Sequence, residues 1–235
     1  MALDHAPRAV HLQPAADLAD RVLLPGDPRR ALIVAQSLLD QPKMFNHSRG
    51  LWGYTGEAAD GELLTVQSTG MGGPSAAIVV EELIALGVRR LVRIGTCGTL
   101  VEGLRHGDLL AAETVLPVDG ASRALGAEGQ LAGDPEMTAA LVAAGAAPVT
   151  VVSTDLFFDP RAGEASGWVR RGASAVEMEA AALFQVAALR GARAACALAV
   201  TDVPSGDGAA RVGPEELEEL GRRVGAAGYE ALRSR

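Results

Sequence analysis

Residues 91–98, Leu91-Val92-Arg93-Ile94-Gly95-Thr96-Cys97-Gly98, decide the fold of this chain. A short apolar run followed by glycines is typical of a buried strand that ends in a turn, so we expect a strand over 90–94 and a turn over 95–98. Arg93 interrupts the apolar run, and a buried guanidinium is costly unless an anion meets it. That anion is either a carboxylate of the protein or a bound ligand, and the pattern alone leaves both open.

The order of strand, tight turn and helix recurs along the chain and predicts an α/β fold. Because strands alternate with helices, we expect a sheet that is covered by helices on both faces, in three layers. Residues 1–20 are predicted to form an arm, and no linker divides 1–235, so we expect a single domain. The segments 118–135 and 203–213, rich in Gly, Ala, Asp and Pro, are expected to be the loosest. The predicted strands are 21–24, 63–68, 90–94, 108–116, 150–152 and 194–200, and the predicted helices are 31–39, 75–86, 176–190 and 214–232.

Composition excludes several classes of function. The net charge of −8 argues against a general nucleic-acid binder, which normally carries a basic surface. Cys97 and Cys196 lie in apolar runs and fit reduced core thiols of a cytosolic protein. We see no signal peptide, no apolar run of the roughly 20 residues that span a bilayer, and no cluster of metal ligands. The expectation is a cytoplasmic protein that binds neither nucleic acid nor membrane and needs no metal.

The unusual turns follow predicted strands, and ligands of such sheets bind outside the carboxyl ends of the strands. The turn at Gly26 is either a plain strand-to-helix connection or, with Arg30, an anion site. The glycines around Met71 resemble part of a dinucleotide fingerprint, but Ser75 breaks that pattern. Arg93 and Thr96 could together hold a phosphate, unless Arg93 is paired with a carboxylate.

Four other side chains have a structural and a chemical interpretation each. Glu177 and Glu179, predicted at a helix start, either complement the helix dipole or accept hydrogen bonds from a vicinal diol. Asp202 at a strand end is either a turn residue or a general acid. Phe157 either packs in the core or stacks on a base. His11 alone suggests only a surface residue.

Together these motifs resemble the hexameric nucleoside phosphorylase family, which includes the bacterial purine and the uridine phosphorylases. The resemblance covers residues 11–232 and therefore implies a mixed sheet within one α/β/α domain. The matching motifs, in the family's order, are Pro25-Gly26-Asp27-Pro28-x-Arg30, Arg49-Gly50, Gly70-Met71-Gly72, Arg93-Ile94-Gly95-Thr96-Cys97-Gly98, Ser153-Thr154-Asp155-Leu156-Phe157, Glu177-Met178-Glu179-Ala180-Ala181 and Thr201-Asp202.

The resemblance assigns these residues to three subsites. The phosphate subsite consists of Gly26, Arg30, Arg93 and Thr96, with Arg49 supplied by a neighbouring subunit. The ribose subsite consists of Met71, Met178 and Glu179, with His11 reaching the 5′-hydroxyl from the other subunit of a dimer. The base subsite consists of Cys97, Gly98, Phe157, Glu177, Thr201 and Asp202. The implied assembly is a hexamer, a trimer of dimers.

The reaction that the resemblance implies is reversible phosphorolysis of a ribonucleoside, with inorganic phosphate as co-substrate and no cofactor. Phosphate attacks C1′ and stabilises the oxocarbenium-like ribose, while Asp202 protonates the departing base, an effect typically worth about 10²–10⁴-fold. Arg211 is the nearby candidate to assist Asp202.

A purine is the favoured base. Uridine phosphorylases of the family use a Gln and an Arg beyond the stacking Phe, whereas residues 158–164 contain no Gln. The alternatives are a uridine phosphorylase, a methylthioadenosine phosphorylase or nucleosidase, and a non-catalytic nucleoside-binding module. The preference among adenosine, inosine, guanosine and methylthioadenosine is left open.

Overall fold

Eleven strands form one mixed sheet in the computed structural model, which describes residues 9–161, 163–205 and 208–233. The strands follow one another in space as β11-β10-β6-β8-β9-β5-β1-β4-β3-β2, with β7 beside β6. β10 also pairs with β5, so β5, β9, β8, β6 and β10 close on themselves. The strands are β1 (Arg21–Leu24), β2 (Leu39–Asn46), β3 (Gly53–Ala58), β4 (Leu63–Gln67), β5 (Arg90–Thr99), β6 (Leu109–Pro117), β7 (Leu131–Ala132), β8 (Ala147–Ser153), β9 (Ala173–Glu177), β10 (Arg193–Ser205) and β11 (Gly208–Arg211).

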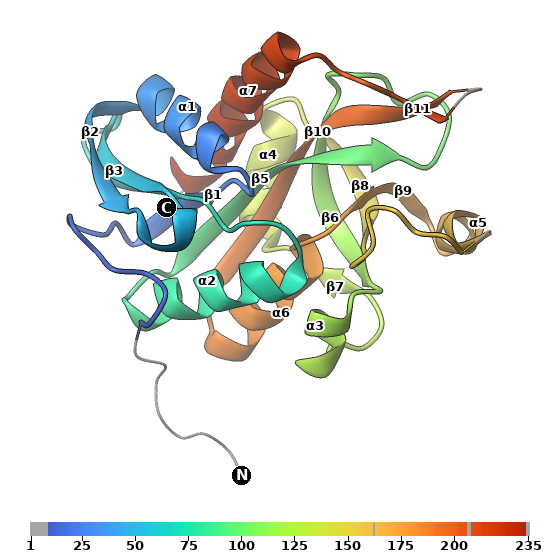
Figure 1. Ribbon diagram of the computed structural model, residues 1–235, viewed down its shortest axis with the longest axis horizontal. Coiled ribbons are helices and arrows are strands. Elements are labelled where there is room, and N and C mark those ends of the chain that lie inside the picture. Colours follow the sequence, from blue (N-terminus) through green and yellow to red (C-terminus); the bar gives the residue numbers. More distant parts are fainter. Residues whose placement is uncertain (1–8, 162, 206–207, 234–235) are drawn as a thin grey trace.

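Helices cover both faces of this sheet, as Figure 1 shows. One apolar core joins α1, α4 and α7 to the sheet, and a second lies between the sheet and α2 and α6. This confirms the prediction of a three-layer α/β/α fold. The helices are α1 (Pro28–Leu38), the 3₁₀ turn η1 (Ser48–Gly50), α2 (Gly73–Ala85), α3 (Gly120–Ala124), α4 (Pro135–Ala143), α5 (Glu164–Arg170), α6 (Ala180–Arg190) and α7 (Pro214–Arg233).

The strand that carries Arg93 is longer than predicted. The turn expected over 95–98 is instead part of β5, because β10 pairs with it in parallel from Arg90 to Gly98. An irregularity between Val200 and Asp202 sets Asp202 opposite Gly98. Backbone pairing with β10 therefore keeps the glycine-rich end of β5 extended.

One further prediction was wrong in detail, one hairpin was missed, and the two segments expected to be loosest contain regular elements. The helix expected from residue 176 begins at Ala180, and Glu177 ends β9 instead. The hairpin of β2 and β3 was not predicted, because β2 carries Pro42 and exposes most of its centre. The segments expected to be loosest contain α3, β7 and the β10–β11 hairpin. Residues 1–8 of the predicted arm lie outside the described residues.

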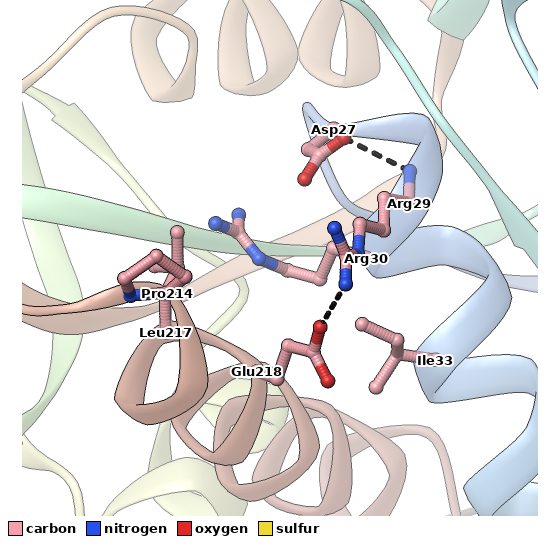
Figure 2. Close-up of a pocket in the computed structure, with 7 residues that line it drawn as sticks. All are labelled: Asp27, Arg29, Arg30, Ile33, Pro214, Leu217 and Glu218. Carbon is pink, nitrogen blue, oxygen red and sulfur yellow. Dashed lines mark hydrogen bonds and ion pairs between the residues drawn. The ribbon is translucent and has the colours of Figure 1, made fainter.

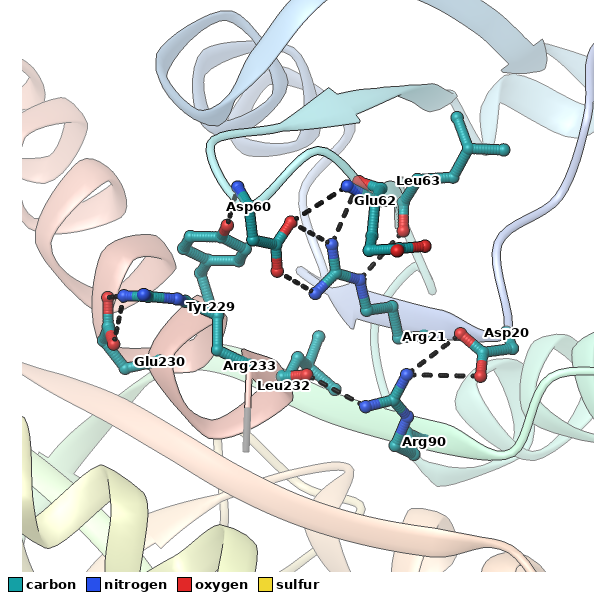
Figure 3. A network of polar contacts seen from close by, with 10 residues as sticks. All are labelled: Asp20, Arg21, Asp60, Glu62, Leu63, Arg90, Tyr229, Glu230, Leu232 and Arg233. Atoms are coloured by element: carbon teal, nitrogen blue, oxygen red, sulfur yellow. Dashed lines mark hydrogen bonds and ion pairs between the residues drawn. The ribbon is translucent and has the colours of Figure 1, made fainter. Parts of the chain in front are cut away.

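A polar network closes the edge of the sheet where β1 begins, as Figure 3 shows. Arg21 forms two hydrogen bonds to the Asp60 carboxylate, at 2.6 and 2.7 Å, and the Tyr229 hydroxyl accepts a bond from Asp60 N–H. The hydrogen bonds from Arg21 hold the pKa of Asp60 well below its usual range. The network attaches α7 to the β3–β4 turn at the N-terminal end of β1. The candidate site lies at the other, carboxyl end of this strand.

Candidate functional site

The loops that follow β1 and β4 are joined by backbone hydrogen bonds. Gly70 N–H donates to Gly26 O at 3.0 Å, and Thr69 N–H donates to Pro25 O at 2.9 Å. A Cβ added at Gly26 would lie 3.1 Å from Gly70 O, so a side chain there would force the two loops apart. Glycine at position 26 therefore permits the close approach that brings the N-termini of α1 and α2 to one edge of the sheet.

Arg30 is a buried cation that no acid among the described residues pairs with, although the charges of Asp27 and Glu179 act on it and favour a higher pKa. It lies in the first turn of α1, which Asp27 caps by accepting from Arg29 N–H at 2.9 Å. The stem of Arg30 packs on α7, where a Cβ at Gly221 would lie 3.3 Å from Arg30 Cγ. Within the described ranges Arg30 makes no hydrogen bond or ion pair, and only 8% of the residue is exposed. Burial lowers its pKa, and the nearby Arg93 acts in the same direction.

Figure 2 shows the pocket between α1 and α7 that Arg30 lines. Its neighbour Arg29 is paired with Glu218, but no interaction is drawn to Arg30. Because an unpaired buried cation is costly, the surroundings of Arg30 favour an anionic ligand.

Arg93 has carboxylate partners inside the protein. Its Nε donates to Glu177 Oε2 at 2.9 Å, and its Nη2 lies 2.5 Å from Glu179 Oε2. Of the two kinds of partner that the sequence left open for this guanidinium, the structure supplies carboxylates: two internal acids already offset its charge. Burial lowers its pKa, but Glu179 and Glu177 outweigh that effect and raise it. In the described chain Nη1 has no partner, so a donor for an anion remains.

Glu177 is fully engaged in holding Arg93 and the start of α6. Besides Arg93, its carboxylate accepts from Ser153 Oγ and from the backbone N–H groups of Glu179 (2.9 Å) and Ala180 (3.0 Å). Its side chain has no exposed area. The Glu177 carboxylate is therefore bound by donors of the protein, and its expected place at the base subsite stays a prediction.

Glu179 connects two of the loops. Its Oε1 accepts from Gly72 N–H at 2.5 Å, at the N-cap of α2, while Oε2 faces Arg93. Met178 beside it is half-buried, and Met71 is exposed next to Gly72. Met71, Met178 and Glu179, which are expected at the ribose subsite, therefore lie at the starts of α2 and α6. These two helix starts are joined by the bond between Gly72 and Glu179.

Asp202 and Arg211 face each other across the β10–β11 hairpin. Arg211 Nε lies 2.6 Å from Asp202 Oδ1, and Thr201 Oγ1 donates to Asp202 Oδ2 at 2.8 Å. The Arg211 guanidinium also lies over the Phe157 ring, 5.3 Å from its centre. Phe157 is 56% exposed, so core packing is not its role. The structure thus brings an acid, a cation and an aromatic face together.

The other β5 residues differ in what they present. Gly98 lies opposite Asp202, and the half-buried Thr96 has a hydroxyl that bonds to no described residue. Cys97 points into the core, where its thiol contacts Ala199 O at 3.7 Å and burial raises its pKa. The place of Cys97 at the base subsite stays a prediction, whereas the prediction that both cysteines are free and buried is confirmed.

His11 lies outside this group of residues. Its ring and backbone are bound by Glu82, which lies about 15 Å along α2 from Gly72. Arg49 is exposed at a positive φ of 58°, and its guanidinium makes no hydrogen bond or ion pair with a described residue. The structure therefore holds the His11 ring on α2, away from the site of its own chain.

Two buried residues that sequence reasoning missed anchor these segments. Glu82 is an acid on the apolar side of α2, which is the signal that could have revealed it. Asn46 accepts from Gln13 N–H at 2.9 Å and donates to Leu51 O at 2.6 Å. Asn46 therefore links the arm that carries His11 to the loop that carries Arg49.

The described residues contain no group of three or more His, Cys, Asp or Glu that could hold a metal ion. Within the same ranges, every helix is too short or too polar to cross a membrane.

Comparison with known proteins gives concordant matches over most of the chain. Residues 20–234 match the family model described as Phosphorylase superfamily. A DeoD-type purine nucleoside phosphorylase of Caldanaerobacter subterraneus subsp. tengcongensis is 38% identical over 201 residues, covering 79% of this chain and 84% of the relative. One of Geobacillus kaustophilus is 37% identical over 195 residues, covering 79% and 82%. A crystal structure of uridine phosphorylase from Vibrio fischeri ES114 superposes with a TM-score of 0.81 over 93% of both chains, at 22% identity, and so supports the fold.

Proposed function

The chain belongs to the phosphorylase superfamily, and on that premise we propose that it is a purine nucleoside phosphorylase. It converts a purine ribonucleoside and inorganic phosphate into the free base and ribose 1-phosphate, and the reaction is reversible. The enzyme is a pentosyltransferase that uses phosphate as co-substrate and needs no cofactor. The purine assignment rests on the DeoD-type relatives and on Asp202 at the base end of the site.

The observation that carries the proposal is the buried, unpaired Arg30 beside the close-packed loops at Gly26 and Gly70. An ionised guanidinium with free donors suits a phosphate, which offers several strong acceptor oxygens. Phosphate bound there would also reach the free Nη1 donor of Arg93 and the Thr96 hydroxyl. The internal pairs of Arg93 with Glu177 and Glu179 would keep its guanidinium in place for this contact.

The remaining residues divide the chemistry between them. Glu179 would accept hydrogen bonds from the ribose 2′- and 3′-hydroxyls, with Met71 and Met178 beside the sugar. Phosphate would attack C1′ as the bond to the base breaks, and its negative charge would stabilise the oxocarbenium-like sugar. Once its pair with Arg211 is broken, Asp202 would take up a proton from solvent and transfer it to N7 of the purine, so that the base departs neutral and Asp202 is left as the carboxylate.

Arg211 has two functions in this scheme. It holds Asp202 through Oδ1 and covers the face of Phe157 on which a base would stack. Entry of the base would therefore displace Arg211 from the ring while Asp202 turns toward N7. Only after this exchange would Phe157 and Asp202 contact the same purine.

We also propose that the site is completed by a second subunit. His11 is held on α2 by Glu82, away from the site of its own chain, and the loop that carries the exposed Arg49 is joined to the arm through Asn46. A dimer in which each chain lends both residues to the other, repeated as a hexamer, would use them. Cytoplasmic purine salvage is the setting that fits this reaction.

An ultraviolet assay of base release tests the proposal. Adenosine, inosine, guanosine, methylthioadenosine and uridine are each incubated with and without phosphate. We expect cleavage of purine ribonucleosides that depends on phosphate. Equal rates without phosphate would indicate a hydrolytic nucleosidase, and cleavage of uridine alone would indicate a uridine phosphorylase. Binding without turnover of any nucleoside would reject an enzymatic function.

A further inference from the structure

Glu82 holds the His11 ring as well as the backbone of the arm. Its Oε2 accepts from the backbone N–H groups of His11 and Leu12, at 2.9 and 2.8 Å. Its Oε1 lies 2.6 Å from His11 Nδ1, and its side chain is almost fully buried on α2. Oε2 accepts from both backbone N–H groups of the arm, and Oε1 contacts the imidazole while it also accepts the longer bond, 3.1 Å, from His11 N–H.

This arrangement determines which ring nitrogen carries the proton. Burial alone would raise the pKa of Glu82, but hydrogen bonds from Leu12 N–H and from His11 outweigh it and lower that pKa. An ionised carboxylate can only accept, so the proton between Oε1 and the ring must be on Nδ1. In a neutral imidazole the other nitrogen, Nε2, is then an acceptor. No described residue bonds to Nε2, and 29% of the His11 side chain is exposed.

We propose that Glu82 is a positioning residue that fixes His11 in the Nδ1-protonated tautomer, so that Nε2 accepts a hydrogen bond from the 5′-hydroxyl of the nucleoside. This inference rests on the proposed function, in which His11 reaches the site of a neighbouring subunit. It makes the 5′ end of the substrate a determinant of specificity. A 5′-hydroxyl can donate to Nε2, whereas a 5′-ether or thioether can only accept. The site therefore favours nucleosides with a free 5′-hydroxyl over 5′-O-alkyl and 5′-alkylthio nucleosides.

The Glu82→Gln variant separates the tautomer from the anchoring of the arm. Its carbonyl oxygen would stay on the two backbone N–H donors, which need an acceptor. Its NH₂ group would then face Nδ1 and donate to it. Nδ1 must accept in that arrangement, so the ring proton moves to Nε2 while the arm stays docked.

The kinetic readout is the ratio of kcat/KM for inosine to kcat/KM for 5′-O-methylinosine, at saturating phosphate. The assay is run at about pH 8.5, which favours neutral imidazoles. In Glu82→Gln the protonated Nε2 would donate to the ether oxygen, so we expect the ratio to fall by about tenfold. Inosine alone should change little, because its hydroxyl can rotate to accept. The bulk of the 5′-O-methyl group affects the wild type and Glu82→Gln equally, so it cancels when their kcat/KM ratios are compared.

A second readout needs no substrate. In protein labelled with ¹⁵N at histidine, NMR of the ring nitrogens shows directly which of them is protonated. We expect the His11 proton on Nδ1 in the wild type and on Nε2 in Glu82→Gln. Glu81→Gln is the matched control, because Glu81 precedes Glu82 on the same helix and pairs with Arg190 at 2.8 Å. Neither readout should move in the control.

The outcomes distinguish the two proposals. If no nucleoside is cleaved, the proposed function fails, and the NMR measurement still decides the tautomer. If inosine is cleaved but the His11 proton stays on Nδ1 in Glu82→Gln and the kinetic ratio is unchanged, the role of Glu82 is rejected. If Glu82→Gln does not fold, the wild-type NMR spectrum is sufficient: a His11 proton on Nε2 would reject the role of Glu82. In a His11→Ala background, Glu82→Gln should leave the ratio unchanged.

Discussion

Replacing Gly95 by alanine should destabilise the protein far more than replacing Gly98, although both lie on β5 and neither has a positive φ. A Cβ at Gly95 would lie 2.7 Å from Arg93 Nη2 and 2.8 Å from its Cζ, with Leu198 Cδ2 at 3.0 Å. A Cβ at Gly98 would find its nearest atoms at 3.5 and 3.6 Å, which is ordinary contact. The guanidinium of Arg93 therefore lies directly over the bare backbone of Gly95.

The cost follows from what holds that guanidinium. It cannot move aside freely, because Glu177 binds Nε at 2.9 Å and Glu179 lies 2.5 Å from Nη2. Forcing an extra methyl into a packed core costs about 1–3 kcal/mol, and losing one partner of a buried ion pair costs about 3–5 kcal/mol. Because the arginine can relax in part, we expect Gly95→Ala to lower the free energy of unfolding by about 2–4 kcal/mol. Gly98→Ala should stay within about 1 kcal/mol of the wild type.

Thermal unfolding of the two variants at equal protein concentration, without phosphate, measures the difference. For a domain of this size 1 kcal/mol shifts Tm by about 2–4 °C, so Gly95→Ala should unfold about 4–16 °C below the wild type. Equal shifts in the two variants would refute the reasoning. So would a shift below about 2 °C in Gly95→Ala, since the clash would then be relieved without disturbing the buried charges.

Three further predictions concern other charges. In the absence of phosphate, Arg30→Met should not lower Tm, because it removes an unpaired buried cation. Phosphate should raise the Tm of the wild type but not that of Arg30→Met, and a retained rise in the variant would contradict the phosphate site. Arg211→Ala should reduce kcat/KM for adenosine by about tenfold or more, with little change in Tm because the Arg211 side chain is 62% exposed; unchanged kinetics would count against its role. Asp202→Asn should impair adenosine more than inosine, and equal losses on both substrates would count against the role of Asp202. Because the pKa of Asp60 is depressed, its pairing with Arg21 stabilises the protein above about pH 4, and this stabilisation is lost as the pH falls toward the folded-state pKa. In urea unfolding, Asp60→Asn should therefore cost about 1.5–3 kcal/mol at pH 7 and clearly less near about pH 2. A pH-independent difference would refute the linkage.

The sequence by itself determined the alternation of strands and helices and the edge at which the site forms. Apolar runs ending in glycine identified β1, β4 and the first half of β5, and Pro74 marked the start of α2 as the structure has it. These signals are local, because hydrophobic spacing and turn residues act within a few positions of one another. From them follows the position of Gly26, Arg30 and Arg93 near the carboxyl ends of neighbouring strands.

Only the tertiary structure decided what the buried charges pair with. Arg93 and Glu177 are 84 residues apart, and no spacing in the sequence indicates that they meet. The same holds for Glu82 and His11, which are 71 residues apart. The extension of β5 to Thr99 depended equally on distant elements, because β10 pairs with it as far as Gly98 and β9 pairs with Gly98 and Thr99.

The difference between Arg30 and Arg93 shows why the sequence could not resolve the site further. Both arginines are buried, and the sequence left open a carboxylate or a ligand for Arg93 and a plain turn or an anion site for Arg30. Packing of β9 and α6 against β5 gives Arg93 two acids, whereas no acid among the described residues pairs with Arg30 between α1 and α7. A charge is buried wherever the chain folds around it, but its compensation depends on which distant groups the fold brings within a few ångströms.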